Sequence, residues 1–189
     1  MNIRNRTVKL SWLFSALIIA FLAFLSSRSS QAAANSATLG CADVRVSGQT
    51  TSYLGCSYAG ARSSAETTAR AFLSANADAL NFDSGSVADM ALVEVKNGLA
   101  STHTRLEQVY NGYPVFGGTL VVSQGPDGAV QTLHTAYVSG LNGSGTATKS
   151  AAEAEASAMQ AAGATALRFD SPSRLVWFPY KDSAILAWE

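Results

Sequence analysis

Residues 108–118 read QVYNGYPVFGG, a stretch that combines three aromatic residues, three glycines and a proline. Asn111-Gly112 is a pair that readily adopts the positive φ angles of a tight turn. Pro114 fixes its own φ and restricts the preceding residue to extended geometry. Gly117-Gly118 lets the chain bend and lets another backbone approach closely. The pattern predicts a turn that shapes the corner of a β-sheet.

Three roles are open for this stretch. Its aromatic side chains can cover the corner of the sheet, or they can present apolar area to a partner. A small-ligand loop has little support, because no polar groups converge on it. The candidate turn and partner-docking residues are Gln108, Tyr110, Gly112, Pro114, Val115, Phe116, Gly117 and Gly118.

The surrounding segments predict antiparallel strands with short turns. Turn signals occur at Asn97-Gly98, Asn111-Gly112 and Pro126-Asp127-Gly128. Apolar and β-branched residues between these turns indicate strands at 91–95, 102–110, 117–124 and 129–138. Before them, residues 63–80 show apolar positions at helical spacing, and Ser63 with Glu66 makes a capping box.

The fold class expected from this order is α+β. It consists of an antiparallel sheet of about four strands with one packed helix, followed by a second helix and a partial β-hairpin. The second helix begins at Ser150, with Glu153 at the capping-box spacing, and stops near Gly163. The partial hairpin turns at Lys181-Asp182. Because the sequence stops at Trp188-Glu189 within the second strand, we expect a chain cut short.

The N-terminal residues 1–34 read as an export signal. A basic start precedes an apolar run at residues 10–25, and small residues suited to an export peptidase follow near Ala34. The apolar run is shorter than a spanning helix requires, which favours a cleaved signal peptide over an uncleaved membrane anchor. The expected location is therefore secreted, without stable membrane association after cleavage.

Residues 35–62 are rich in Ser, Thr, Gly and Ala and predict an irregular N-terminal arm. This arm contains both cysteines of the chain, Cys41 and Cys56. In an exported chain the default interpretation is one disulfide between them. The Leu-Gly-Cys sequences also resemble a lipid-attachment motif, but they lie far beyond the apolar run. Zinc binding by these cysteines would need further ligands.

Composition and motifs argue against several functions. Charged residues make up 14% of the chain, with Lys plus Arg equal to Asp plus Glu, so nucleic acid is not an expected partner. The two histidines, His103 and His134, lie apart on strand candidates, and neither is followed by Glu. The carboxylates Glu153 and Glu155 read as solvated helix residues. No nucleophile set is evident either, so we expect no enzymatic activity, cofactor or metal site on this chain.

Residues 104–133, TRLEQVYNGYPVFGGTLVVSQGPDGAVQTL, resemble the fungalysin/thermolysin propeptide (FTP) domain. The shared positions form a Gln-x-Tyr-x-Gly segment, a Pro-Val-Phe-Gly-Gly turn, a Val-rich strand at Val121-Val122 and an Asp-x-Gly-type turn at Asp127-Gly128. The resemblance spans about residues 63–140. Residues 148–189 resemble the start of a PepSY-type module, which follows FTP in precursors of secreted zinc metallopeptidases.

This resemblance implies a pro-region that assists folding of a thermolysin-like peptidase and inhibits it. The partner would be a metallopeptidase catalytic domain, in cis or in trans, and zinc would belong to that domain alone. Two other functions remain open: a stand-alone exported binding module or protease inhibitor acting in trans, and a membrane-tethered interaction protein that keeps residues 10–25 as an anchor.

Overall fold

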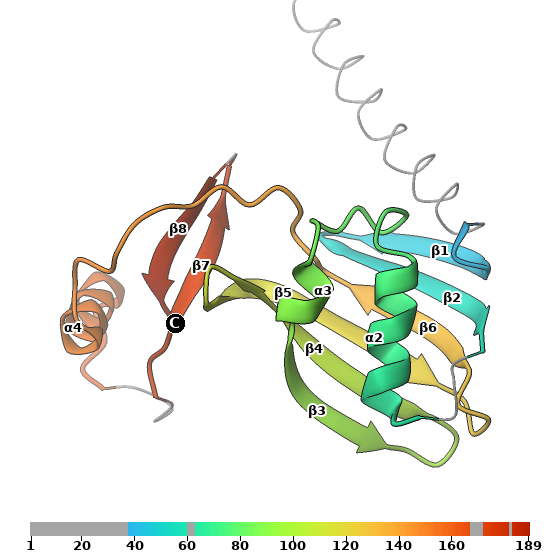
Figure 1. Ribbon diagram of the computed structural model, residues 1–189. Helices are drawn as coiled ribbons and strands as arrows, with labels where there is room; N and C mark the ends of the chain where they lie inside the picture. Colours follow the sequence, from blue (N-terminus) through green and yellow to red (C-terminus); the bar gives the residue numbers. More distant parts are fainter. Residues whose placement is uncertain (1–37, 60–62, 167–171, 182) are drawn as a thin grey trace, which may run out of the picture.

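The computed structural model describes residues 38–59, 63–166, 172–181 and 183–189 (Figure 1). The predicted signal peptide and its membrane-anchor alternative lie outside these residues. No helix in the described part is long and apolar enough to span a bilayer. The elements in chain order are β1 (Cys41–Ser47), β2 (Thr50–Tyr58), α2 (Ala65–Ala75), α3 (Ser86–Asp89), β3 (Ala91–Asn97), β4 (Thr102–Tyr110), β5 (Tyr113–Gln124), β6 (Val130–Thr135), α4 (Ala151–Ala162), β7 (Leu175–Tyr180) and β8 (Ser183–Trp188).

The described strands form one mixed, eight-stranded sheet. Six of them run in the order β1-β2-β6-β5-β4-β3 with antiparallel pairing, and β7 pairs in parallel with β5 and antiparallel with β8. The expected fold class, an α+β fold with about four strands and one packed helix, is therefore wrong: the molecule is mostly β. Two features account for the difference: residues 41–58 form the β1–β2 hairpin where an irregular arm was expected, and the predicted β7–β8 hairpin joins the same sheet through β5.

The β1–β2 hairpin corrects the predicted irregular arm. Ser, Thr and Gly are frequent in it, yet Tyr53 and Cys56 point to the core at the spacing of a strand that contains a bulge. Cys41 lies directly opposite Cys56, and a disulfide joins the two. The predicted disulfide is thus present, and it closes the open end of this hairpin. The polar composition concealed the strands because only one of their faces is buried.

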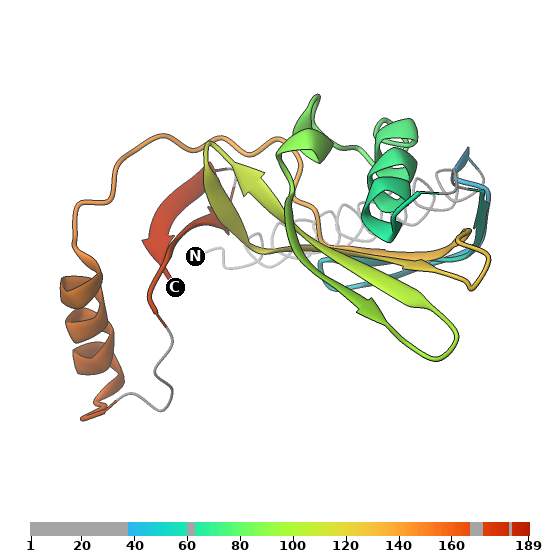
Figure 2. The ribbon, with the colours of Figure 1, turned by 60° about the horizontal axis from the view of Figure 1, so that its bottom comes forward.

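Helix α2 covers one face of the sheet (Figure 2). Phe72 and Leu73 are fully buried on it, against Leu106, Leu120 and Leu133 of the strands. The helix begins one residue later than predicted: Ser64 is the N-cap and accepts a hydrogen bond from the Thr67 backbone. The predicted partner of the capping box, Glu66, instead pairs with Arg70 at 2.8 Å.

The C-terminal elements extend beyond this main layer. Helix α4 begins with the predicted capping box of Ser150 and Glu153 and ends at Gly163, whose φ is 63°. No residue of α4 is buried. Strands β7 and β8 form the predicted hairpin, although Asp182 at its turn lies outside the described residues. This hairpin packs against the end of the β4–β5 hairpin, which is the location of the QVYNGYPVFGG sequence.

Candidate docking site

The β4–β5 hairpin ends in a two-residue turn. Tyr110 pairs with Tyr113, and Asn111 and Gly112 between them have φ angles of 45° and 81°. Positive φ at both central positions is the signature of a type I′ turn, whose twist matches that of the flanking strands. The predicted tight turn at Asn111-Gly112 is confirmed.

A large bulge separates this turn from the main sheet. Glu107 pairs with Thr119, but the next pair is Val109 with Pro114, so Gln108 on β4 faces the longer segment 115–118 on β5. Extra residues on one strand bend that strand and increase its twist. Gly117 lies at the bend with a φ of 75°. The bulge thus redirects the tip of the hairpin away from the main sheet.

The side chain of Gln108 bridges the gap that the bulge leaves in the sheet. Its Nε2 donates to the carbonyl of Val138 at 2.8 Å, and the Val138 N–H donates to its Oε1 at 2.9 Å. Just before this point, the N–H of Ala136 still donates to the carbonyl of Thr119 on β5. The Gln108 amide therefore takes the place of a peptide group of β5. Only 2% of the surface of Gln108 is exposed, and both of its polar atoms are satisfied.

Gly118 makes room for the Gln108 amide. A Cβ at this glycine would lie 3.0 Å from both Cβ and Oε1 of Gln108, and 3.1 Å from Cβ of Val115. Such distances require one of the neighbours to move. The close approach of another backbone predicted for Gly117-Gly118 is therefore wrong: side chains approach Gly118, and a Cβ at Gly117 would meet nothing within 4 Å.

The inner side of the redirected tip is buried against the β7–β8 hairpin. Val115 is the parallel partner of Trp177, and both are almost completely buried. The Tyr110 ring meets the Trp177 indole edge-on, with 5.6 Å between centroids. Ala184 of β8 completes this second small core. The tip is thus a packed corner, and its position depends on residues that lie far along the chain.

The outer side of the same corner is apolar and exposed. Phe116 lies on the opposite face of β5 from Val115, and its ring packs on Phe178 with 5.4 Å between centroids. Ile185 lies opposite Phe178 across the hairpin, and Tyr180 follows two residues later on the same face. We call these four residues, Phe116, Phe178, Tyr180 and Ile185, the aromatic face.

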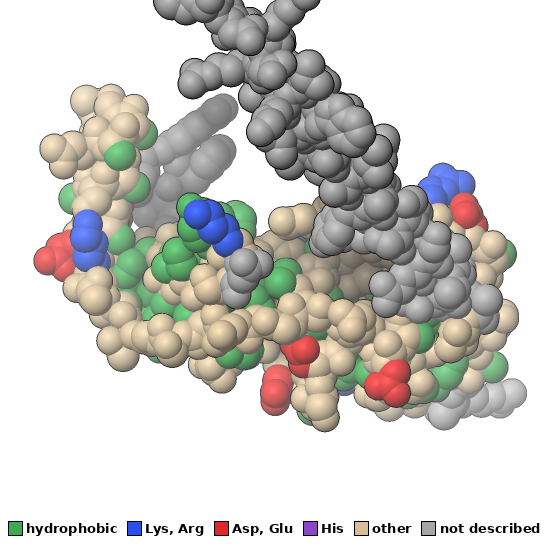
Figure 3. Space-filling view, turned by 90° about the horizontal axis from the view of Figure 1, so that it is seen from above, with side chains coloured by type: hydrophobic (Ala, Val, Ile, Leu, Met, Phe, Trp, Pro, Cys, Tyr) green, Lys and Arg blue, Asp and Glu red, His purple; other side chains and the backbone are tan. Residues whose placement is uncertain are grey.

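Between 40% and 50% of the surface of each member of the aromatic face is exposed. Lys181, at the rim, places its Nζ 5.2 Å from the centre of the Tyr180 ring. Viewed from above, apolar side chains gather at the β7–β8 hairpin, with a basic side chain beside them (Figure 3). Contiguous apolar patches with a polar rim are typical of protein-interaction sites.

A guanidinium fixes the corner to the main sheet. Arg174, just before β7, donates to both carboxylate oxygens of Glu107 on β4, at 3.0 and 2.8 Å, and its Nε donates to Glu189 at 2.9 Å. The hydrogen bonds to Glu107 are the main reason that the pKa of Arg174 is raised. Half of the Arg174 side chain is exposed, so solvent screens these ion pairs. They therefore orient the β7–β8 hairpin on the main sheet more than they stabilise the fold.

Both histidines make local contacts to serines. His103 lies between the hydroxyls of Ser101 and Ser123, at 2.9 and 2.8 Å, and His134 contacts the Ser52 hydroxyl at 2.8 Å. Ser123 and Ser52 lie on strands adjacent to these histidines, and Ser101 lies just before β4, as expected for cross-strand histidines. Among the described residues, no group of three or more His, Cys, Asp or Glu is placed to hold a metal ion.

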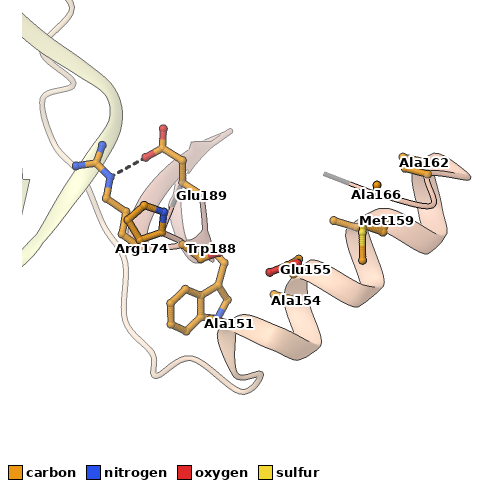
Figure 4. Close-up of a pocket in the computed structure, with 13 residues that line it drawn as sticks. Ala151, Ala154, Glu155, Met159, Ala162, Ala166, Arg174, Trp188 and Glu189 are labelled. Atoms are coloured by element: carbon orange, nitrogen blue, oxygen red, sulfur yellow. Dashed lines mark hydrogen bonds and ion pairs between the residues drawn. The ribbon is translucent and has the colours of Figure 1, made fainter. Parts of the chain in front are cut away.

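A groove of about 730 Å³ separates helix α4 from the end of β8. Alanines of α4 and Met159 line one side, and Trp188, Arg174 and Glu189 line the other (Figure 4). The indole Nε1 of Trp188 donates to the carbonyl of Lys149 at 2.9 Å, which ties β8 to the start of α4. The guanidinium of Arg174 is already paired with the carboxylates of Glu189 and Glu107. The groove therefore offers apolar area and no convergent reactive groups.

Comparisons with known proteins centre on the sheet that carries the bulge. Residues 93–137 match the model of the Fungalysin/Thermolysin Propeptide Motif. The chain is also 37% identical over 102 residues to the transglutaminase-activating metalloprotease of Streptomyces mobaraensis. That alignment includes 52% of this chain but only 13% of the relative, so the chain spans a small part of the relative's length.

The matched segment includes most of β3 and all of β4, β5 and β6, and therefore the whole QVYNGYPVFGG corner. Of the predicted docking residues, Phe116 is the one that joins the aromatic face. Gln108 and Val115 are buried, and Tyr110 and Pro114 are half-buried. Sequence reasoning missed the other members of this face, because nothing in their alternating pattern indicates that β7 pairs with β5.

Proposed function

We propose that this chain is the pro-region of a thermolysin-like zinc metallopeptidase, acting as a folding assistant and inhibitor of the catalytic domain. The observation that carries the proposal is the match of residues 93–137 to the Fungalysin/Thermolysin Propeptide Motif. The relative named as a metalloprotease supports the same assignment. The proposed boundaries are 63–140 for the FTP-like domain and 148–189 for the start of a PepSY-like module.

The physical role of such a region is kinetic. A secreted protease can owe its persistence to a high barrier to unfolding, and a high barrier also slows its folding. A segment that binds the folding intermediate lowers the barrier while it is attached, and its removal leaves the barrier to unfolding in place. This role needs a preformed surface and no reactive groups.

The aromatic face fits this requirement. Aromatic residues dominate the energetics of many protein interfaces, because they bury large area at low conformational cost. Phe116 is held by the bulge at Gly117, and Phe178 is held by the Trp177 core beneath it. Rigid anchors of this kind lose little entropy on binding.

We further propose that the chain is exported and that residues 1–34 are its signal peptide. The disulfide between Cys41 and Cys56 supports an oxidising compartment. The 189 residues contain no His-Glu-x-x-His sequence, so the zinc site of the partner would lie on other residues, in cis or in trans. In this proposal the chain itself cleaves no bond and binds no cofactor.

The test is a refolding and inhibition experiment. The catalytic domain of the Streptomyces mobaraensis metalloprotease is denatured and refolded with and without the full chain, and recovered peptidase activity is measured. The proposal predicts a higher yield of folded peptidase, and also slower hydrolysis when the chain is added to native enzyme. If the chain changes neither the yield nor the hydrolysis rate, at concentrations well above that of the enzyme, the pro-region assignment fails.

A pair of variants tests the surface within the same experiment. Phe116→Ser removes an exposed anchor of the aromatic face, and Val46→Ser removes a similarly exposed apolar side chain on β1. We expect Phe116→Ser to weaken inhibition roughly tenfold or more, since an interface hot spot contributes about 2 kcal/mol, and Val46→Ser to leave inhibition unchanged.

A further inference from the structure

Strand β3 presents an exposed edge of the sheet, at the opposite side from β1 (Figure 1). Within the described part of the chain, β4 is its one strand neighbour. Every residue of β3 is exposed, including the apolar side chains of Leu92, Val93 and Val95 at 42–48%. An apolar edge strand with unpaired backbone groups is a template for pairing with another strand.

The pairing with β4 shows which backbone groups of β3 point outward. The N–H of Gly98 donates to the carbonyl of Ser101 at 2.8 Å, so this pair is hydrogen-bonded. In an antiparallel ladder, hydrogen-bonded and non-hydrogen-bonded pairs alternate. Lys96 and Glu94 therefore direct their N–H and C=O groups to β4, whereas Val95 and Asn97 direct theirs away from the sheet.

These outward groups fit a second copy of the same strand. If two β3 strands meet antiparallel around a two-fold axis at Val95, each Val95 donates its N–H to the carbonyl of the other. The same register places Glu94 of one copy opposite Lys96 of the other, twice. Opposite charges at directly opposed positions stabilise a strand pair. The bulge that follows Leu92 limits the pairing to about residues 93–97.

We propose that two copies of this chain associate through β3, in this register, to form one continuous sheet. The interface is isologous, as in most homodimers. Pairing of one short strand buries less than the roughly 1,200 Å² of a stable complex, so the dimer is weak and its population rises with concentration. The proposal is independent of the metallopeptidase role, because β3 lies apart from the aromatic face.

The complementary charges allow a direct test by sedimentation of the full chain over a range of concentrations. Glu94→Lys places two lysines opposite each other in the dimer, and Lys96→Glu places two glutamates opposite each other. We expect each single variant to weaken association roughly tenfold, and the double variant, Glu94→Lys with Lys96→Glu, to restore it. Within one chain, Glu94→Lys puts a positive charge opposite Arg105 of β4, and the double variant keeps this repulsion. Recovered association of the double variant therefore cannot come from a more stable monomer.

A thiol at the two-fold axis gives a second readout. Val95→Cys places two sulfurs across the axis, and both natural cysteines are already joined in a disulfide. We expect Val95→Cys to form a covalent dimer under mild oxidation much faster than Val46→Cys on the β1 edge. A chain that stays monomeric at all concentrations, association that neither single variant weakens, or equal oxidation rates for the two thiols would each overturn the proposal.

Discussion

At the scale of single residues, the side-chain amide of Gln108 makes two hydrogen bonds that a backbone peptide group of β5 would otherwise make. Gln108 completes the hydrogen bonding of Val138 where β5 has turned away, and Gly118 leaves the space that this amide occupies. A buried polar group without its partner costs more than the hydrogen bond itself contributes. The corner that carries the aromatic face therefore depends on this pair of residues as well as on the contacts of Trp177 and Arg174.

Replacement of Gln108 by Leu should destabilise the fold by about 2–4 kcal/mol, because it leaves both the N–H and the C=O of Val138 without partners. Urea denaturation monitored by circular dichroism measures the change. The matched control is Gln160→Leu on α4, an exposed position where we expect little effect. A loss of stability no larger than that of the control would show that Gln108 is not structural.

Substitutions at Gly118 and at Gly112 should change the stability of the fold by different amounts. Gly118→Ala forces the methyl group against Gln108 and should cost about 1–3 kcal/mol, as overpacking does. Gly112 has positive φ but open space around it, and Asn tolerates this conformation, so Gly112→Asn should be nearly neutral. Thermal melting of the two variants makes the comparison, and a larger loss for Gly112→Asn would contradict the steric argument.

At the scale of elements, the β7–β8 hairpin is joined to the main sheet by a small core and one ion-pair cluster. Trp177 fills most of that core between Val115, Tyr110 and Ala184. Trp177→Ala should detach the hairpin, which would raise amide exchange over residues 175–188 and leave exchange in β4 and β6 unchanged. Trp188→Ala is the control, since this indole lies at the groove beside α4. Equal exchange in both variants would rule out Trp177 as the anchor.

Helix α4 should show a pH dependence of its own. The backbone N–H of Ser150, and then its hydroxyl, donate to Glu153 and lower the pKa of that carboxyl. A lowered folded pKa means that the carboxylate stabilises the helix above the unfolded value of about 4.3. This contribution is lost as the pH falls through the folded pKa. The protection of the α4 amides, measured relative to the intrinsic exchange rate at each pH, should therefore fall in acid, and Glu153→Gln should remove this loss of protection.

At the scale of the whole molecule, local sequence patterns predicted the β3–β6 meander, the tight turn at Asn111-Gly112 and the capping box of α4. They failed where the composition of a strand resembles that of a loop, and where the pairing is long-range. The polar β1–β2 hairpin buries only Tyr53 and the cysteines on its inner face, so its composition resembles a loop. The pairing of β5 with β7 has no local signature. The aromatic face combines Phe116 with residues of this second hairpin, so the sequence pointed to one of its four members.

In the proposed function, the aromatic face docks on a metallopeptidase catalytic domain. The most direct measurement is amide exchange of the full chain with and without the catalytic domain of the Streptomyces mobaraensis metalloprotease. We expect protection of the segments around Phe116 and residues 178–185, and loss of that protection in Phe116→Ser but not in Val46→Ser. Binding that leaves these segments unprotected, or no binding at all, would contradict it.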